Sequence, residues 1–411
     1  MTMSRIISII GAGAGHAGLL TEQVTQIIKT ADEVYASGKI AGTLITLRDT
    51  WRVVPFSDMK ELAIESKKQH IVLLLEGDSL FFDKGEQLYN ELKNYADVKC
   101  YAGVSSVQYL CAKTNQSYND IYWLEYESED LLAAISYNKK VAVLLSGENI
   151  PDHICRLLCD AGLNNMRVTV GSRIATGRER IVQDEAKHLR DYEFANPSVM
   201  IIENPNFNDK AKTVFDDELK LCENALTQEV RWSAANLMRI KPTDKVINIG
   251  AGSGEMAVEL ARMAYKGSVV AIEEDASEFE MLKQNKEHLG LYNISTLYGN
   301  ALEMIEHNVD IIPDAVFVGD NVRGIKRILQ SLKHKNDKIR VVIVAHNLER
   351  LSEAQAALAS LRFAAVEVSQ LTLSKAKTLG SHTMMLSDKP MFLLCGGKEL
   401  MNENIDIKKD E

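Results

Sequence analysis

The second half of the chain contains a glycine-rich loop made of Gly250, Ala251, Gly252, Ser253 and Gly254. It follows the apolar residues 246–249, which have the length of a buried strand, and precedes residues 255–265, which have a helical pattern. Glycine lets a backbone approach a ligand closely, and the N-terminus of the next helix favours polar or anionic groups. A dinucleotide loop has the spacing GxGxxG, whereas this loop is GxGxG followed by Glu255. The small residue against which a pyrophosphate would pack is therefore missing.

An acidic residue, Glu273, lies 19 residues after Gly254, at the end of the predicted strand 269–272. A carboxylate at that position can accept two hydrogen bonds from a ribose diol. Residues 298–301 end the next strand, where Ala301 and its neighbours could contact the edge of an adenine. This order predicts a nucleoside held across the strand ends of a doubly wound sheet, and S-adenosylmethionine fits it better than NAD. The alternative is a tight turn followed by a surface glutamate.

A second glycine-rich loop follows the predicted strand 5–10 and contains Gly11, Gly13 and Gly15. A literal GxGxxG is also present at Gly13, Gly15 and Gly18, so dinucleotide binding stays an open alternative for this loop. In a dinucleotide-binding fold the acidic residue stands at the end of the second strand. Here Asp32 and Glu33 precede the apolar pair 34–35, so we expect them to cap the start of that strand.

Two further loops of small, hydrogen-bonding residues belong to the same half. One spans residues 76–82 and includes Gly77, Asp78 and Ser79. The other spans residues 103–106 and ends with Ser105 and Ser106. Three such loops at three strand ends predict a shared ligand-binding cleft. Taken singly, each loop is also compatible with an ordinary turn, and Asp78 with a residue that caps one.

The elements that must position these loops alternate between strand-like and helical patterns, which is typical of α/β layers with a largely parallel sheet. Residues 21–30 are predicted to form a helix capped by Thr21. The predicted strands are residues 5–10, 71–75, 98–101, 141–145, 168–171, 199–203, 246–249, 269–272, 341–344 and 391–394. A helix is also expected around residues 230–238.

The 411 residues fit two domains better than one. Residues 204–217 contain Pro205, several asparagines and alternating charges, which is typical of an interdomain linker. The expected organisation is a first domain at 1–204, a linker at 205–217, a second domain at 218–400 and a disordered tail at 401–411.

Composition excludes several function classes. The net charge of −10 argues against nonspecific nucleic-acid binding. No apolar run approaches the roughly 18 residues that span a bilayer, and no secretory signal is expected. The six cysteines include no CxxC pair. Cys155 and Cys159 lie near His153 without a fourth ligand, so we expect free thiols, no metal site and a reducing, cytoplasmic location.

The first half resembles the tetrapyrrole (corrin and porphyrin) methylases. The resemblance rests on the spaced glycines followed by Leu20-Thr21, on Ala31-Asp32-Glu33-Val34, on Gly77-Asp78-Ser79 and on Gly103 to Ser106. Ser79 and Ala102 stand where that family has proline. The stretch Arg178 to Val182 resembles the late "ERI" strand of the C5-methylase branch.

The second half resembles the class I decarboxylating C15 methyltransferases of cobalamin biosynthesis. The resemblance rests on Thr227 to Arg231, the GAGSG loop, Ala271-Ile272-Glu273, Gly299-Asn300-Ala301 and Asp314 to Gly319. The fused order resembles the bifunctional precorrin-6B C5,C15-methyltransferases. There are departures at Asn248, where the family often has Asp, at Gln228, where Lys is usual, at Gly319-Asp320, where Gly-Gly is usual, and at Lys389-Pro390, where Asn-Pro is usual.

The resemblance implies an α/β chain with a two-lobed tetrapyrrole methylase domain followed by a doubly wound, Rossmann-like class I methyltransferase domain. It implies two methyl transfers to a precorrin or cobalt-precorrin, with S-adenosylmethionine as cofactor, no nucleic-acid or membrane partner, and a homo-oligomer. The implied cofactor residues of the first domain are Gly11, Gly13, Gly15, Gly77, Asp78, Ser79, Ser105 and Ser106. Those of the second are Thr227, Gly250, Ala251, Gly252, Ser253, Gly254, Glu273 and Ala301. Another tetrapyrrole acceptor, or one domain that has lost catalysis, remains the alternative.

The catalytic residues cannot be named from the sequence, because methyl transfer to an electron-rich carbon needs orientation more than a strong base. Arginines are expected to bind the carboxylates of such a substrate, and the candidates are Arg173, Arg178, Arg231 and Arg323. The alternative for each is a solvated surface position. His346 and His382 could face the cleft or be structural. Trp51, Trp123 and Trp232 are expected to be core or domain-contact residues rather than stacking platforms.

Overall fold

The computed structural model describes residues 5–81, 84–125, 130–145, 151–210, 212–379 and 381–397. The charged tail that was expected to be disordered lies outside these residues. The chain divides into two compact units, one formed by Met1–Glu125 with Lys140–Glu203 and the other by Tyr126–Lys139 with Asn204–Glu411. The expected domain boundaries stay a prediction.

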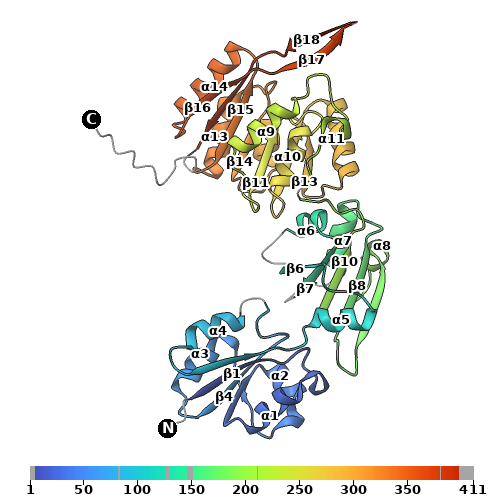
Figure 1. The fold of residues 1–411 in the computed structure, drawn as a ribbon, viewed down its shortest axis with the longest axis vertical. Coiled ribbons are helices and arrows are strands. Elements are labelled where there is room, and N and C mark those ends of the chain that lie inside the picture. The colour runs from blue at the N-terminus through green and yellow to red at the C-terminus, as the bar shows by residue number, and fades with distance from the viewer. Residues whose placement is uncertain are drawn as a thin grey trace, which may run out of the picture. The chain divides into compact units, whose positions relative to one another are not determined.

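The first sheet of the first unit is parallel throughout and has the order β3-β2-β4-β1-β5. Its strands are β1 (Ile6–Gly11), β2 (Glu33–Ala36), β3 (Arg52–Val53), β4 (His70–Leu75) and β5 (Asp97–Tyr101). Helices α1 (Glu22–Thr30) and α2 (Gly38–Thr43) pack on one face, while α3 (Phe56–Glu65) and α4 (Lys84–Leu92) pack on the other (Figure 1). Both faces are covered, which explains why β1 and β4 are continuous apolar runs.

The predicted helix 21–30 is confirmed, because α1 begins after Thr21, whose Oγ1 accepts a hydrogen bond from the Val24 amide at 3.3 Å. This side chain satisfies one of the free N–H groups of the first turn.

The second sheet of the first unit departs from the expected parallel arrangement. Its strands are β6 (Ile121–Glu125), β7 (Lys140–Leu144), β8 (Arg167–Ser172), β9 (Arg180–Glu185) and β10 (Ser198–Glu203), in the order β6-β7-β10-β8-β9. Only β6 and β7 run parallel, and the other neighbours are antiparallel. The short connection between β8 and β9 makes them a hairpin, which excludes a parallel pair. Helices α5 (Ser106–Thr114), α7 (Pro151–Asp160) and α8 (Ala186–Leu189) complete this lobe.

Helix α6 (Leu131–Tyr137) belongs to the second unit, although the strands before and after it in the chain belong to the first. Its Tyr137 is buried in the core of the second unit and donates a hydrogen bond to the Ala261 carbonyl at 2.9 Å. Ser136 accepts a hydrogen bond from the Tyr292 amide at 2.8 Å. The helix therefore supplies part of the second unit's core.

The second unit is built on one large sheet in the order β13-β12-β11-β14-β15-β19-β16. Its strands are β11 (Lys245–Ile249), β12 (Ser268–Glu273), β13 (Ile294–Tyr298), β14 (Ala315–Val318), β15 (Arg340–Ala345), β16 (Glu367–Leu371) and β19 (Met391–Gly396). Only β19 runs antiparallel to its neighbours. The strand order reverses between β12 and β14, with β11 at the turning point, as in doubly wound folds.

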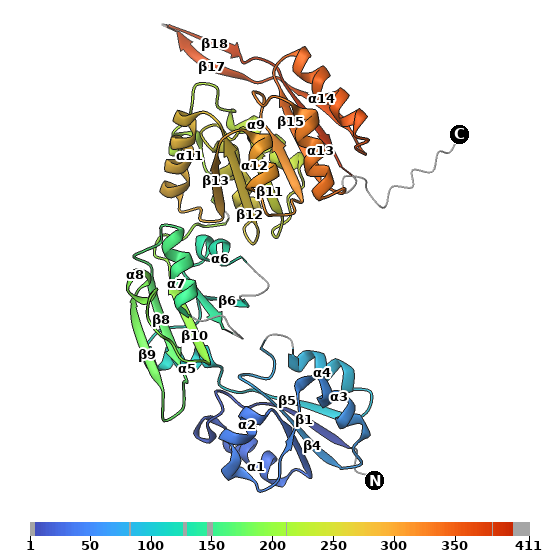
Figure 2. The same cartoon turned by 180° about the vertical axis from the view of Figure 1, so that it is seen from behind.

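Helices cover both faces of this sheet (Figure 2). One core contains residues of α9 (Gln228–Leu237), α10 (Glu255–Met263) and α11 (Ala276–Leu289). The opposite core contains residues of α12 (Ala301–His307), α13 (Ile325–Lys335) and α14 (Leu348–Ser360). Alternate residues of β11 enter the two cores, Val246 on one side and Ile247 on the other. The predicted doubly wound domain is thus confirmed.

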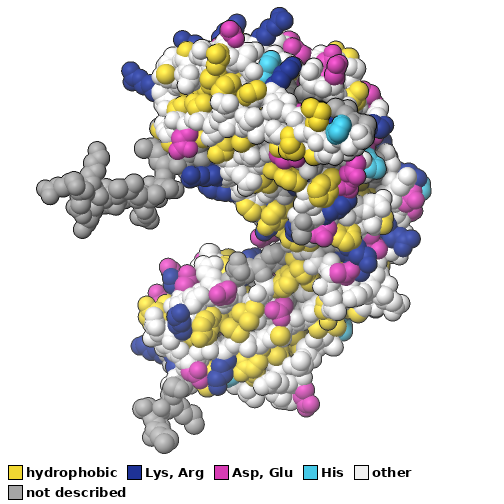
Figure 3. Space-filling view, turned by 45° about the horizontal axis from the view of Figure 1, so that its top comes forward, with side chains coloured by type: hydrophobic (Ala, Val, Ile, Leu, Met, Phe, Trp, Pro, Cys, Tyr) yellow, Lys and Arg dark blue, Asp and Glu magenta, His cyan; other side chains and the backbone are white. Residues whose placement is uncertain are grey.

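A hairpin that was not predicted, β17 (Ser374–Leu379) with β18 (His382–Ser387), extends beyond the helices (Figures 1 and 2). It carries three exposed apolar residues, Met384, Met385 and Leu386. On the face drawn in Figure 3, acidic and basic side chains are interspersed. Within the described residues, no helix has both the length and the apolar character that a bilayer crossing requires.

Candidate cofactor sites

The three loops predicted in the first unit meet backbone to backbone. Gly13 and Gly77 each donate a hydrogen bond to the other's carbonyl, both at 2.9 Å. A Cβ on Gly11 would lie 2.6 Å from the Gly77 carbonyl oxygen and 2.8 Å from the Gly103 nitrogen. Glycine is therefore required at Gly11 because the loops approach so closely, and Gly13 and Gly15 are required by backbone φ angles of +61° and +84°.

The polar side chains of these loops hold the loops themselves. Asp78 accepts one hydrogen bond from the Gly103 amide at 2.8 Å and another from the Leu80 amide at 2.9 Å. Ser79 donates to the Tyr101 carbonyl at 2.8 Å. Ser105 caps α5 by accepting from the Gln108 amide at 3.1 Å, while Ser106 opens that helix, half-buried. Asp78 is thus a turn-capping residue that also joins two loops, and its assignment to a cofactor stays a prediction.

The geometry contradicts the dinucleotide alternative for the first loop. In a dinucleotide-binding sheet the first two strands are neighbours, whereas here β1 lies between β4 and β5. Asp32 accepts hydrogen bonds from the Gln69 and His70 amides, at the start of β4. Glu33 is the buried first residue of β2. Both carboxylates therefore lie at the strand starts, as expected, and not at the strand ends where a ribose would be bound.

The glycine loop of the second unit joins β11 to α10. Gly250, Gly252 and Gly254 have φ angles of +65°, +59° and +87°. These are left-handed conformations that cost little only for glycine. A Cβ on Gly250 would also lie 2.6 Å from the Val322 side chain. Glycine therefore stands at each of the three positions whose backbone conformation requires it.

Glu273 ends β12 and points at this loop. One carboxylate oxygen accepts a hydrogen bond from the Gly252 amide at 2.7 Å, and the other accepts from the Glu274 and Asp275 amides, both at 2.8 Å. The side chain is buried, so the alternative of a surface glutamate is wrong. A carboxylate offers about four acceptor positions, so three N–H donors leave room for a further donor such as a hydroxyl.

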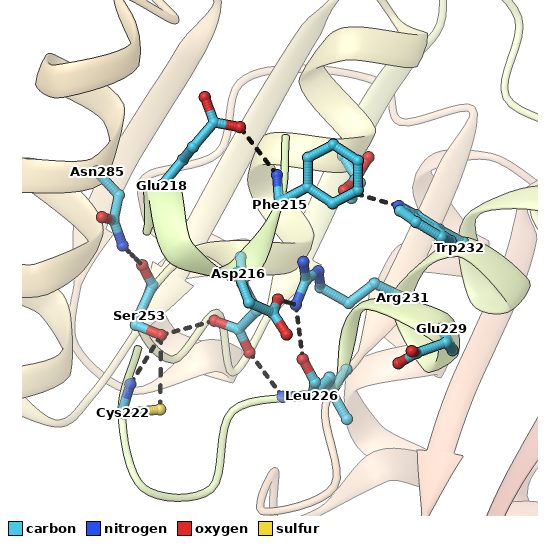
Figure 4. A network of polar contacts seen from close by, with 12 residues as sticks. Phe215, Asp216, Glu218, Cys222, Leu226, Glu229, Arg231, Trp232, Ser253 and Asn285 are labelled. Carbon is cyan, nitrogen blue, oxygen red and sulfur yellow. Dashed lines mark hydrogen bonds and ion pairs between the residues drawn. The ribbon is translucent and has the colours of Figure 1, made fainter. Parts of the chain in front are cut away.

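Residues 216–231, here called the strap, contact the glycine loop through a polar network that the sequence did not predict (Figure 4). Ser253 accepts a hydrogen bond from the Cys222 amide at 3.2 Å and donates to Glu255 at 2.8 Å. Glu255 also accepts from the Leu226 amide at 3.1 Å. Burial raises the pKa of Glu255. Nothing in the local sequence marks Glu255 as buried, because its partner Leu226 lies 29 residues away in the chain.

Arg231 lies at the end of the strap and is completely buried, so its interpretation as a surface arginine is wrong. Its Nη1 donates to the Leu226 carbonyl at 2.8 Å and lies 2.7 Å from an oxygen of Asp216. Leu226 thus connects Arg231, through its carbonyl, and Glu255, through its amide. The strap is thereby fixed against the glycine loop.

The two remaining predicted residues flank this region. Thr227 precedes α9 without capping it, and its buried Oγ1 has no hydrogen-bond partner among the described residues. Ala301 begins α12, and the nearby Gly299 amide donates to the Glu273 carbonyl at 2.9 Å. The structure therefore places Ala301 close to the end of β12.

An aspartate and a histidine follow two neighbouring strands, β14 and β15, of which β14 is paired with β11. Asp320 follows β14, and His346 follows β15. Asp320 forms an ion pair with His346 Nδ1, and its other oxygen accepts a hydrogen bond from the His346 amide at 3.0 Å. His346 therefore has a carboxylate partner, which the sequence could not predict.

The other predicted side chains differ in exposure. Arg173, Arg178 and Arg323 are exposed, and His382 lies in the exposed hairpin. Each tryptophan has a structural contact: Trp51 donates to the Arg48 carbonyl, Trp123 packs on Phe81, and Trp232 donates to Glu259. The cysteines are free thiols, and no cluster suited to a metal occurs within the described ranges.

Comparison with known families agrees with this geometry. A family model described as "Precorrin methyltransferase domain" matches residues 220–394, and one described as "Tetrapyrrole (Corrin/Porphyrin) Methylases" matches residues 7–190. Fold, glycine loops and family models together define a methyltransferase with two domains of different build.

Two relatives are described as "Probable cobalt-precorrin-6B C(15)-methyltransferase (decarboxylating)". The protein of Sulfurisphaera tokodaii is 32% identical over 172 residues, which cover 42% of this chain and 88% of that protein. The protein of Saccharolobus solfataricus is 28% identical over 185 residues, which cover 44% and 91%. The chain belongs to the precorrin methyltransferase family.

A solved structure of a precorrin-6Y C5,15-methyltransferase from Geobacter metallireducens is also similar. It is 23% identical, covers 45% of this chain and 96% of its own, and has a TM-score of 0.42.

Proposed function

We propose that this enzyme methylates a corrin precursor at two positions in cobalamin biosynthesis. The first domain, at residues 1–204, acts at C5. The second, at residues 218–400, acts at C15 and removes the carboxyl group of the C12 acetate. The observation that carries the proposal is Glu273, whose carboxylate contacts the Gly252 amide at the end of β12 and retains room for a ribose hydroxyl.

S-adenosylmethionine fits the groups at the second site. Gly250 to Gly254 would bring the backbone close to the cofactor, Glu273 would accept from its ribose, and Ala301 would contact its adenine. Thr227 Oγ1, which has no hydrogen-bond partner among the described residues, would bond the amino-acid part. In the first domain we assign cofactor binding to the backbone of Gly11, Gly13, Gly15 and Gly77 and to the hydroxyls of Ser105 and Ser106. The bound cofactor supplies a methyl group on a positively charged sulfur.

The chain's own residues orient the acceptor and exclude water. The nucleophile is an electron-rich carbon of the substrate, so alignment provides most of the acceleration and no strong base is needed. The exposed Arg173, Arg178 and Arg323 bind carboxylates of the substrate as charged, forked donors.

Two further properties belong to the proposal. The exposed apolar residues of the β17–β18 hairpin become covered in a homo-oligomer, because apolar side chains on a projecting hairpin favour association. The free cysteines fit a reducing cytoplasm.

The test incubates the protein with S-adenosylmethionine and precorrin-6B and determines the product by mass spectrometry. The proposal expects two methyl groups gained and one carboxyl group lost. The E273A variant should no longer methylate C15 or remove the carboxyl group, but it should still methylate C5. The control E274A changes the adjacent exposed carboxylate and should behave as the wild type. Equal loss of both methyl groups in E273A would contradict two separate sites.

A further inference from the structure

The Asp320–His346 pair lies at the carboxyl ends of the strands, as does the cofactor loop. In register, Val318 of β14 pairs with Ile343 of β15 and with Ile249 of β11. The residues that follow these three strand ends therefore emerge side by side. In an open α/β sheet, ligands bind outside the carboxyl ends of the strands, where the strand order reverses. Asp320 and His346 emerge next to that position.

Backbone packing brings the pair to the glycine loop itself. A Cβ on Gly319, the residue before Asp320, would lie 2.7 Å from the Gly250 carbonyl oxygen. Arg350, which is buried, donates from Nη2 to the Gly319 carbonyl at 3.2 Å. Gly319, which precedes Asp320, thus packs against the cofactor loop on one side and bonds the buried guanidinium of Arg350 on the other.

The two members of the pair differ in exposure. The Asp320 side chain is 16% exposed and has both carboxylate oxygens engaged by His346, whereas the His346 side chain is 43% exposed. The aspartate is therefore fixed, and the imidazole is accessible to a ligand and to solvent. The side-chain Nδ2 of Asn347 lies 3.4 Å from His346 Nε2. An imidazole held by a carboxylate at Nδ1 is the arrangement in which the other nitrogen exchanges protons.

The proposed reaction consumes a proton. The bond between the acetate methylene carbon and its carboxylate carbon breaks, CO2 leaves, and the electron pair passes into the conjugated ring. The methylene carbon must then gain one proton to become a methyl group, so an acetate and a proton yield a methyl group and CO2. No electrons are exchanged with another reagent.

The other carboxyl groups near the cofactor loop are less suited to deliver that proton. Both carboxylate oxygens of Glu273 are engaged by three backbone N–H groups. Glu255 is buried beneath the loop and is engaged by Ser253 and Leu226. Neither can present a proton to a substrate that lies above the strand ends.

We propose that His346 gives this proton to the substrate and that Asp320 positions its imidazole. The inference rests on the proposed function of the second domain and adds a proton donor to it. His346 gives the proton from Nε2 and regains one from solvent through its exposed edge. The departure from Gly-Gly at Gly319-Asp320 then contributes to catalysis.

The test compares H346A, H346Q, D320N and the wild type in the precorrin-6B assay, with the exposed His334 of α13 changed in H334A as the matched control. H346A should form the decarboxylated product at least about 10²-fold more slowly, the lower end of the range of about 10²–10⁴-fold for acid–base groups. H346Q keeps a donor for Asp320 but no exchangeable ring proton, so it should be equally slow. D320N should be slow as well, and H334A should match the wild type.

Added imidazole separates a chemical role from a structural one. Imidazole should restore decarboxylation in H346A, because the alanine side chain leaves space for it. It should not do so in H346Q, where the glutamine side chain fills that space. Affinity for S-adenosylmethionine, measured by calorimetry, should be unchanged in every variant. Wild-type decarboxylation in H346Q, or slow H346A that imidazole does not rescue, would overturn the proton-donor role. Absence of C15 methylation in the wild type would instead overturn the proposed function.

Discussion

Replacing Arg231 with methionine tests whether the strap stabilises the second cofactor site. Arg231 is fully buried and connects Leu226 to Asp216. Methionine fills a similar volume without a charge, so the cavity that it leaves is small. The expected effect is therefore the loss of polar contacts rather than of packing.

The polar contacts that R231M removes determine how much free energy is lost. Loss of a hydrogen bond from a charged donor to a buried acceptor costs about 1.5–3 kcal/mol. The ion pair adds about 1 kcal/mol or less, because the Asp216 side chain is 36% exposed and solvent screens it. Removing the guanidinium also removes the free-energy cost of burying it, which partly offsets these two losses. That cost is present because Arg231 Nε and Nη2 have no partner among the described residues. The net loss is about 2 kcal/mol, which corresponds to roughly 30-fold in an equilibrium constant.

Calorimetric titration with S-adenosylmethionine measures this loss, and the first site serves as the internal reference. R231M should weaken binding at the second site by up to roughly 30-fold, because a loosened strap no longer holds Ser253 and Glu255. Binding at the first site should not change.

A second buried arginine offers a matched control. Arg340 pairs with Asp244 and donates to the carbonyls of Met238 and Arg239. R340M should lower the free energy of unfolding by about 3–5 kcal/mol and leave the second-site affinity of the folded protein unchanged. Wild-type affinity in R231M, or equal weakening by R340M, would refute the role of the strap.

Three further predictions concern pH, the first unit and assembly. Because burial raises the pKa of Glu255, its stabilising share is complete below the ordinary pKa and is lost as the pH rises through the raised value. E255Q should therefore show a smaller decrease in unfolding free energy between roughly pH 5 and pH 8 in urea titrations, and equal slopes would contradict this. G103A places a Cβ 2.5 Å from the Gly77 carbonyl oxygen and should abolish cofactor binding at the first site. G42A, where nothing lies within 4 Å, should instead raise helix stability by about 0.5–1 kcal/mol, and normal binding by G103A would disprove the loop contact. Serine at the three exposed apolar positions of the β17–β18 hairpin should lower the particle mass measured by light scattering, and an unchanged mass would argue against association through the hairpin.

The sequence predicted most strands and both glycine loops because these are local features. Left-handed backbone at Gly250 to Gly254 needs glycine wherever it occurs, and buried parallel strands such as β4 are apolar throughout. Spacing also located Glu273 correctly at the end of β12, because one crossover separates it from the loop.

What the sequence could not predict depends on pairing between distant segments. The antiparallel order of β6 to β10, the burial of Arg231 and Glu255, and the partner of His346 all arise when segments far apart in the chain come together. Asp78 is a case in which the residue was identified but its partners were not, because the Gly103 amide belongs to another loop. Nothing in the sequence indicated that helix α6 packs with Ala261 and Tyr292, because these partners follow much later in the chain.

Helix α6 also has a consequence for synthesis on the ribosome. Its hydrogen-bond partners Ala261 and Tyr292 follow 124 and 156 residues later in the chain. At about 5–20 residues per second, the helix emerges on the order of ten seconds before the core that covers it. The first unit is complete once Glu203 has been synthesised, before either partner of α6 has appeared. The nascent chain therefore exposes the apolar residues of α6 until the core of the second unit has been made.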